Sequence, residues 1–230
     1  MTRALGTYGN EAIAHAVARY SSAKITELQG FYLRRSGAAY HDALAALAAL
    51  RKNEDISPWM QVGNMFLADL FNQWDEIALG ALDDEPQPAV VAFETALHLY
   101  AIHQHSKNMP VHAPQSAQDS GQIGKRFGAA CYELAKRSAS ADSVERRMAV
   151  VDSISDFPGM ARSMRSLITM MRSADSPIVL DYGALARDLY LMQFPGSKPS
   201  VMHRWAGDYF HAKLHDQVPR NGENASRRPQ

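Results

Sequence analysis

The sequence predicts an all-α protein with no β-sheet, arranged as two small bundles with about eight or nine helices in total. Apolar side chains recur at intervals of about three or four residues through most of the chain, which is the period of a helix. Alanine, leucine and methionine are plentiful, and all three favour helices. The 230 residues contain no alternating Val/Ile/Thr run and no Asn-Gly hairpin between apolar strands.

The first helices are expected after residues 1–10, which are small and polar and are predicted to fray. An apolar stripe follows over residues 10–32, and Ser21-Ser22 marks a point where that helix could break. Ser36 can cap a second helix that ends at Arg51-Lys52. Cations in a last turn are favoured by the helix dipole, so this pair is interpreted either as that charge effect or as binding residues.

The middle of the chain predicts two more helices and a long loop. Residues 59–77 carry a broad apolar face at helical spacing, and a polar, proline-bearing break at 83–88 precedes a helix from Ala89 to about Ser106. Such apolar faces are more often core than cofactor-binding surface, so both are interpreted as packing. Residues 109–120 are the longest expected loop and the predicted internal boundary.

Five further helices are predicted in the second half from their apolar periodicity. Their bounds are Gly121–Ser138, Asp142–Ser155, Phe157–Ser173, Tyr182–Gln193 and Pro199–His215. Asp142 or Ser143 can cap the second of them, while Pro158 and Pro199 suit first turns. The predicted organisation is an acidic, aromatic-rich bundle at 1–108, a loop at 109–120, a basic bundle at 121–216 and a disordered tail at 217–230.

Charge is segregated along the chain although the formal net charge is +0. Residues 120–172 contain nine Lys or Arg and five acids, whereas residues 53–94 contain nine acids and no Lys or Arg. A single arginine pair on a helix is usually a solvated face. Several pairs on successive helices with few matching acids instead favour a polyanion, such as nucleic acid, on one face. Binding through phosphates would be independent of base sequence and sensitive to salt.

The sequence also bears on location. No apolar run approaches the roughly 20 residues that a membrane-spanning helix needs, and residues 1–6 lack the apolar core of a signal peptide. The one cysteine, Cys131, excludes an internal disulfide and fits a reducing cytoplasm. A buried apolar position is its expected place. We therefore expect a cytoplasmic protein.

Residues that could bind a metal or a nucleotide form weak patterns. His98, His103 and His105 gather near one predicted helix end, but His-Glu-x-x-His and Cys-x-x-Cys are missing, so we expect no metal and no cofactor. The glycine-rich turn at 119–124 lacks the spacing of a P-loop. It would instead present backbone N–H groups at a helix N-terminus beside Lys125 and Arg126, a general site for one phosphate.

Several ordered motifs in the second half resemble a single family. They are Leu97–Ser106, Ser120–Lys125, Val144–Met148, Met164–Arg172, Leu180–Pro195, Arg204-Trp205 and Asp208–Phe210. Together they are similar to the small subunit of the type I-E CRISPR surveillance complex Cascade, also called CasB. The likeness is loose over residues 28–52. It departs from the family pattern at Met192, at Gly128 and in a longer, less basic loop at 109–114.

The resemblance implies a non-enzymatic helical subunit that works with guide RNA, target DNA, the backbone and large subunits of Cascade and a second copy of itself, away from membranes. Its basic face would hold the phosphates of the target and displaced strands and stabilise the R-loop. The predicted nucleic-acid-binding residues are Arg51, Lys52, Lys125, Arg126, Arg137, Arg146, Arg147, Arg165 and Arg172. Of these, Arg126 and Arg137 rest on charge alone.

Alternatives remain at this point. Arg187 and Arg204 could be structural partners of Asp181, Asp188 or Asp208 rather than binding residues. The chain could also be a stand-alone helical nucleic-acid-binding or regulatory protein. An enzyme that uses the three neighbouring histidines is a third class.

Overall fold

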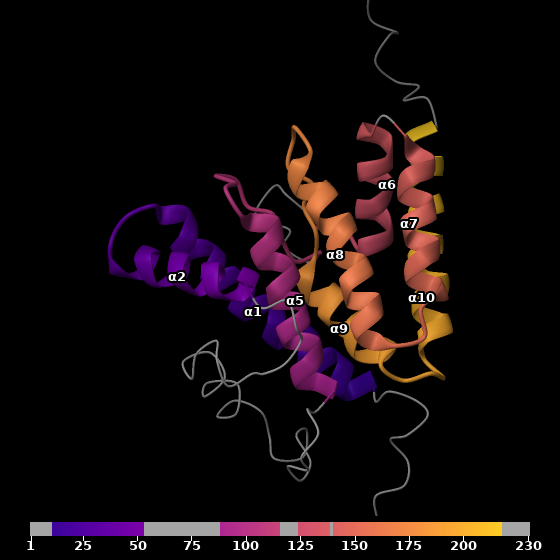
Figure 1. The fold of residues 1–230 in the computed structure, drawn as a ribbon, viewed down its shortest axis with the longest axis horizontal. Coiled ribbons are helices and arrows are strands. Elements are labelled where there is room, and N and C mark those ends of the chain that lie inside the picture. Colours follow the sequence, from indigo (N-terminus) through magenta and orange to yellow (C-terminus); the bar gives the residue numbers. More distant parts are fainter. Residues whose placement is uncertain (1–10, 53–87, 116–123, 139, 218–230) are drawn as a thin grey trace, which may run out of the picture.

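The computed structural model describes residues 11–52, 88–115, 124–138 and 140–217, which form eight α-helices (Figure 1). The helices are α1 (Glu11–Arg34), α2 (Ala38–Lys52), α5 (Pro88–Gln104), α6 (Phe127–Arg137), α7 (Ala141–Ser153), α8 (Phe157–Ser173), α9 (Tyr182–Met192) and α10 (Lys198–Gln217). These ranges contain isolated β-bridges but no strand. The predicted all-α class is confirmed. No described helix combines the length and the apolar character needed to cross a bilayer.

The helices divide in space differently from their order in the chain. In Figure 1, α1 and α2 lie on one side, α6, α7 and α10 on the other, and α5, α8 and α9 between them. Helix α9 packs mainly on α1 and α5, whereas α10 packs mainly on α6. One continuous core runs through both sides. The boundary at residues 109–120 therefore stays a prediction about folding units, and it does not separate the packed core.

The first helices show why local signals misplace helix ends. Helix α1 continues through Ser21-Ser22, so the possible break there was wrong; Ser21 is fully buried in the packed face. Arg35 and Gly37 have left-handed backbones that separate α1 from α2. Helix α5 ends at Gln104, before the predicted end near Ser106. Ser106 lies beyond the helix and also has a left-handed backbone, with φ 62°. The predicted helix at 59–77 lies outside the described residues.

The start of α6 differs from its prediction because the preceding segment pairs with another one. The helix begins at Phe127 rather than Gly121. Lys125 is extended: its N–H donates to the carbonyl of Val179 at 3.2 Å, and its carbonyl accepts from the N–H of Asp181 at 2.9 Å. That N–H is therefore already occupied. The glycine-rich turn at 119–124, which was predicted to present N–H groups to a phosphate, lies outside the described residues except for Gly124.

Helices α7 to α10 lie close to their predicted ranges. The cap of α7 was wrong, because Ser140, rather than Asp142 or Ser143, accepts from the backbone N–H of Ser143. Pro158 lies in the first turn of α8, as predicted. Helix α10 continues to Gln217, two residues beyond its predicted end, and residues 218–230 of the predicted tail lie outside the described part. The expected burial of Cys131 is confirmed.

Two glycines allow close helix contacts. A Cβ on Gly128 would lie 2.0 Å from the carbonyl oxygen of Trp205, so α6 and α10 meet backbone against backbone there. Gly128 therefore serves packing and does not interrupt α6. A Cβ on Gly183 would similarly lie 2.8 Å from the carbonyl oxygen of Ala18. Large side chains at either position would push these helix pairs apart.

The segment after α5 was predicted as a long loop, and part of it is buried in the core. Val111 is fully buried. A buried loop must satisfy its own backbone polar groups, and two glutamines do so. The Gln29 amide exchanges hydrogen bonds with the N–H and the carbonyl of His112, each at 2.9 Å. Gln104 donates to the carbonyls of Lys107 and Met109. The chain beyond α5 is thereby held against α1 and α5.

Candidate nucleic-acid interface

Three predicted cations from two distant parts of the sequence meet beside α5. Arg51 lies in the last turn of α2, while Arg165 and Arg172 are seven residues apart on α8, which packs on α5. The buried face of α8, including Leu167, holds the helix against the core and leaves both arginines at its edge. We call Arg51, Arg165 and Arg172 the α2–α5–α8 arginine cluster.

Two histidines, one on α5 and one just beyond its end, match the spacing of the α8 arginines. His98 and His105 are also seven residues apart, about two helical turns. His98 lies near Arg165, and His105 Nδ1 lies 3.1 Å from Nη1 of Arg172. Each histidine therefore faces one arginine across the contact between α5 and α8. The His98 ring also hydrogen-bonds the carbonyl of Leu50, with 2.7 Å between Nδ1 and oxygen, which brings the end of α2 into the same group.

The electrostatics of the cluster follow first from partial burial and then from like charges that lie close together. Burial lowers the pKa of Arg51, and the charge of Arg172 lowers it further although Tyr32 opposes the shift. Burial lowers the pKa of His105, and the charges of Arg51 and Arg172 lower it further. None of the cluster arginines forms a salt bridge within the described part of the chain. Repulsion of this kind is relieved when an anion binds.

The three neighbouring histidines do not form one site. His103 is fully buried and its Nδ1 lies 3.1 Å from the hydroxyl of Tyr182, whereas His98 and His105 are partly exposed. Burial lowers the pKa of His103 to about 3, with a further contribution from Lys107, so it stays neutral. Within the described ranges there is no group of three or more His, Cys, Asp or Glu placed to hold a metal.

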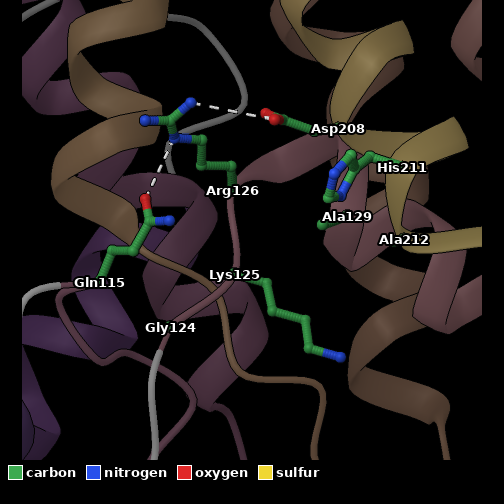
Figure 2. A pocket seen from close by; sticks show the side chains of 8 residues that line it. All are labelled: Gln115, Gly124, Lys125, Arg126, Ala129, Asp208, His211 and Ala212. Carbon is green, nitrogen blue, oxygen red and sulfur yellow. Dashed lines mark hydrogen bonds and ion pairs between the residues drawn. The ribbon is translucent and has the colours of Figure 1, made fainter. Parts of the chain in front are cut away.

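Lys125, Arg126 and Arg137 form a second set, which we call the α6 group. All three face carboxylates. Lys125 Nζ lies 2.6 Å from Glu133 Oε2, and Arg137 Nη2 lies 3.5 Å from the same oxygen. Figure 2 shows Arg126 at the rim of an open pocket, between Gln115 and Asp208, with the Lys125 side chain directed away from both. The Arg126 guanidinium donates to Gln115 at 3.1 Å and lies 3.9 Å from the Asp208 carboxylate.

Carboxylates compensate the cations of the α6 group. Burial would raise the pKa of Glu133, but Lys125, Arg137 and Lys136 outweigh it, so the net shift is downward and Glu133 stays ionised. Asp208 behaves differently: burial raises its pKa, although Arg126 and Arg204 oppose the shift. A phosphate that approached the α6 group would have to compete with these acids.

Three further predicted cations belong to neither set. Arg146 and Arg147 are exposed on α7, where Arg146 Nε donates to the carbonyl of Asp142 at 3.2 Å. Lys52 is exposed at the end of α2. These three form no salt bridge with any described residue. The nine predicted residues therefore separate into the α2–α5–α8 arginine cluster, the acid-paired α6 group and three exposed residues without a described salt bridge.

Arg187 and Arg204 are held by acids, as one of the open interpretations supposed. Arg204 pairs with the buried Asp188, whose second oxygen accepts from the indole N–H of Trp205 at 2.6 Å. This contact links α9 to α10. Arg187 instead lies 2.8 Å from Glu11, an acid outside the three candidates. Burial raises the pKa of Asp188, and Arg204 opposes that shift.

His105 is the residue of this surface that charge counting did not select. A neutral histidine adds nothing to a count of Lys and Arg. The signal available in the sequence was its spacing, because His98 and His105 repeat the interval of Arg165 and Arg172. That coincidence becomes meaningful only when α5 and α8 are known to pack together.

The fold and these surfaces define an α-helical protein with a partly exposed arginine cluster that forms no salt bridge with a described acid. The description "CRISPR-associated protein Cse2" belongs to the family model that matches residues 46–210. The chain belongs to this CRISPR-associated family, whose members are subunits of a CRISPR complex.

A solved structure agrees with that assignment. The crystal structure of CasB from Thermobifida fusca is similar to this chain, with a TM-score of 0.62 and 26% sequence identity. The alignment covers 84% of this chain and 97% of that one. A comparison with curated proteins gave no match.

Proposed function

We propose that this chain is a non-catalytic nucleic-acid-binding subunit of the Cascade complex in the cytoplasm. Its partners would be guide RNA, target DNA, the backbone and large subunits and a second copy of itself. It would stabilise the R-loop through contacts to phosphates of the target and displaced strands, without reading bases. R-loop formation exchanges DNA pairs for RNA–DNA pairs of similar stability, so a few phosphate contacts can decide its direction.

The observation that carries the proposal is the α2–α5–α8 arginine cluster. Its members come from helices far apart in sequence, and no carboxylate of the described residues pairs with them. Exposed arginines on a protein surface are commonly paired with nearby acids or solvated by water. Guanidinium groups crowded together at a partly buried surface favour an external anion, and phosphate suits their planar donors. Lys52, Arg146 and Arg147 would add contacts at longer range.

The proposal is tested by assembly and then by salt dependence. The chain is co-expressed with guide RNA and the other subunits, and the purified particle is examined for its presence. We expect it to enter the particle and to slow R-loop dissociation. Each lost phosphate contact should reduce the log–log salt slope by about 0.9. An R-loop that dissociates equally fast with and without this subunit would contradict the proposal.

Arg146→Glu/Arg147→Glu tests the more distant cations. We expect weaker R-loops with unchanged folding and assembly, since both side chains are exposed on α7. If the double variant holds the R-loop as the wild type does, these arginines are only a solvated face. A chain that binds DNA with a defined consensus and stays outside the particle would instead be a stand-alone regulator.

A further inference from the structure

The contact between Arg172 and His105 defines the protonation state of the histidine. Nη1 of Arg172 lies 3.1 Å from Nδ1 of His105. A guanidinium carries only donors, so Nδ1 must accept this hydrogen bond and cannot hold a proton. The ring proton is then on Nε2, and the imidazole is neutral. In this arrangement the histidine occupies one of the donors of Arg172.

Two cations face His105, and two further charged residues, Lys107 and Asp175, lie beyond the ends of α5 and α8 close by. Arg51 approaches from α2 and Arg172 from α8. Lys107 follows in the same turn, with its Nζ donating to the carbonyl of Ala174 at 3.1 Å. Asp175, just beyond α8, is exposed and forms no ion pair with another described residue. Burial and then the two arginines lower the pKa of His105, so the free protein keeps it neutral at neutral pH.

A bound phosphate would change both the hydrogen bond that His105 accepts and the charge around its ring. Its oxygens are stronger acceptors for a guanidinium than an imidazole nitrogen is, because the hydrogen bond is charge-assisted. Arg172 would therefore turn from His105 to the phosphate and leave the Nδ1 lone pair unoccupied. The negative charge would also offset the field of Arg51 and Arg172. An imidazole next to an anion gains a proton more easily.

We propose that Arg51, His105 and Arg172 form a phosphate-binding site in which a nucleic-acid phosphate displaces Arg172 from His105, and His105 takes up one proton from solvent. The inference rests on the proposed nucleic-acid binding and adds proton linkage at a named residue. The complex would hold one more proton than the free protein, so affinity rises as pH falls. The rise spans the interval between the pKa of His105 in the complex and its lower pKa in the free protein.

The test compares the pH dependence of binding in the wild type with His105→Gln. The full chain is titrated with a labelled DNA duplex at constant ionic strength between about pH 5.5 and about pH 8. Glutamine can still accept from Arg172 through its carbonyl oxygen, but it does not titrate. We expect wild-type affinity to rise by up to about tenfold per pH unit more than that of the variant over part of this range. At the alkaline end the two proteins should bind alike.

His98→Gln is the matched control, since His98 lies on the same face two turns earlier but bonds to the Leu50 carbonyl. A carbonyl only accepts, so His98 Nδ1 must already carry a proton. The His98→Gln variant should keep the wild-type pH slope. Calorimetry in two buffers of different ionisation enthalpy should show about one proton taken up by the wild type and fewer by His105→Gln. Circular dichroism confirms that both variants are folded.

The outcomes separate the two proposals. Equal pH slopes for the wild type and His105→Gln, with salt-sensitive binding retained, would overturn the proton linkage and leave nucleic-acid binding intact. Loss of the slope in His98→Gln rather than in His105→Gln would also overturn it. If the wild type binds the duplex at no pH and no salt concentration, both this inference and nucleic-acid binding by the free chain are wrong.

Discussion

The α2–α5–α8 arginine cluster and the α6 group have the same number of cations but different electrostatic surroundings. In the α6 group, Glu133 and Asp208 lie against the cations. In the cluster, Arg172 hydrogen-bonds the imidazole of His105, which carries no negative charge. The neighbouring His98 bonds the backbone carbonyl of Leu50. A count of basic residues therefore says little about how much positive charge a surface offers to phosphate.

The difference arises from which helices meet. Glu133 is four residues from Arg137 on α6, so that pairing is local and readable from sequence. Asp208 reaches Arg126 from α10 only because Gly128 lets the two helices approach closely. At the other surface α2, α5 and α8 bring arginines and histidines together, and no carboxylate of the described residues forms a salt bridge with these arginines. Packing between distant helices thus decides which arginines remain available.

The largest expected effect comes from reversing charge in the cluster. Arg51→Glu/Arg172→Glu should weaken duplex binding by about a hundredfold or more, since each charge-assisted hydrogen bond contributes about 1.5–3 kcal/mol. The log–log salt slope should fall by about 1.8 if both arginines contact phosphates. Fluorescence anisotropy at several salt concentrations measures both quantities.

Lys125→Glu/Arg126→Glu provides the matched control, because it changes the net charge by the same amount within the α6 group. We expect a much smaller loss of affinity there. If the two double variants lose affinity equally, long-range charge alone governs binding and the contrast between the two surfaces has no functional meaning.

The next effect concerns the hydrogen bonds that hold the segment after α5 in place beside the cluster. Gln104→Leu removes the donors for the carbonyls of Lys107 and Met109, next to His105. Loss of buried hydrogen-bond partners should lower the free energy of unfolding by about 1–3 kcal/mol. Chemical denaturation measures it. Gln115→Leu, which removes an exposed partner of Arg126 beside the α6 group, should cost far less, and equal costs would argue against a rigid support specific to the cluster.

How much of this could be read from the sequence differs between fold and surface. Periodic apolar residues predicted the all-α class and the position of α8. The buried face of a helix consists of apolar residues at helical spacing, such as Met164, Leu167 and Met171. The start of α6 was misplaced, since the extension of Lys125 depends on Val179, more than fifty residues away. The buried segment around Val111 was missed for the same reason.

Freeing the α6 group from its acid should have a smaller effect in the opposite direction. Glu133→Gln removes the carboxylate shared by Lys125 and Arg137. Exposed ion pairs are worth about 0.2–1 kcal/mol, so we expect duplex affinity to increase by about two- to fivefold. Asp152→Asn removes an equal charge from an exposed position on α7 without a salt bridge among the described residues. An equal increase in that control would show that net charge, rather than release of these two cations, is responsible.

The smallest effect is the pH dependence of stability at Glu133. Its pKa in the folded protein is lowered from the ordinary value of 4.5, so the folded state favours the ionised form. The stability that this provides is fully present above about pH 4.5 and is lost as pH falls through the folded-state pKa. For a partly exposed pair we expect about 0.5 kcal/mol. The difference in unfolding free energy between the wild type and Glu133→Gln, measured from acidic to neutral pH, should shrink on acidification.

Asp208 should show the opposite trend, which makes Asp208→Asn an internal comparison for Glu133→Gln. Burial raises the folded-state pKa of Asp208 above the ordinary value of 3.8, so ionisation disfavours the folded state. The contribution of Asp208 to the free energy of unfolding is most favourable below about pH 3.8 and declines as pH rises through the folded-state pKa. If both variants shift the free energy of unfolding in the same direction with pH, Glu133 and Asp208 are not in the distinct environments that the structure gives them. These two carboxylates would then not explain how the charges of Lys125 and Arg126 are compensated.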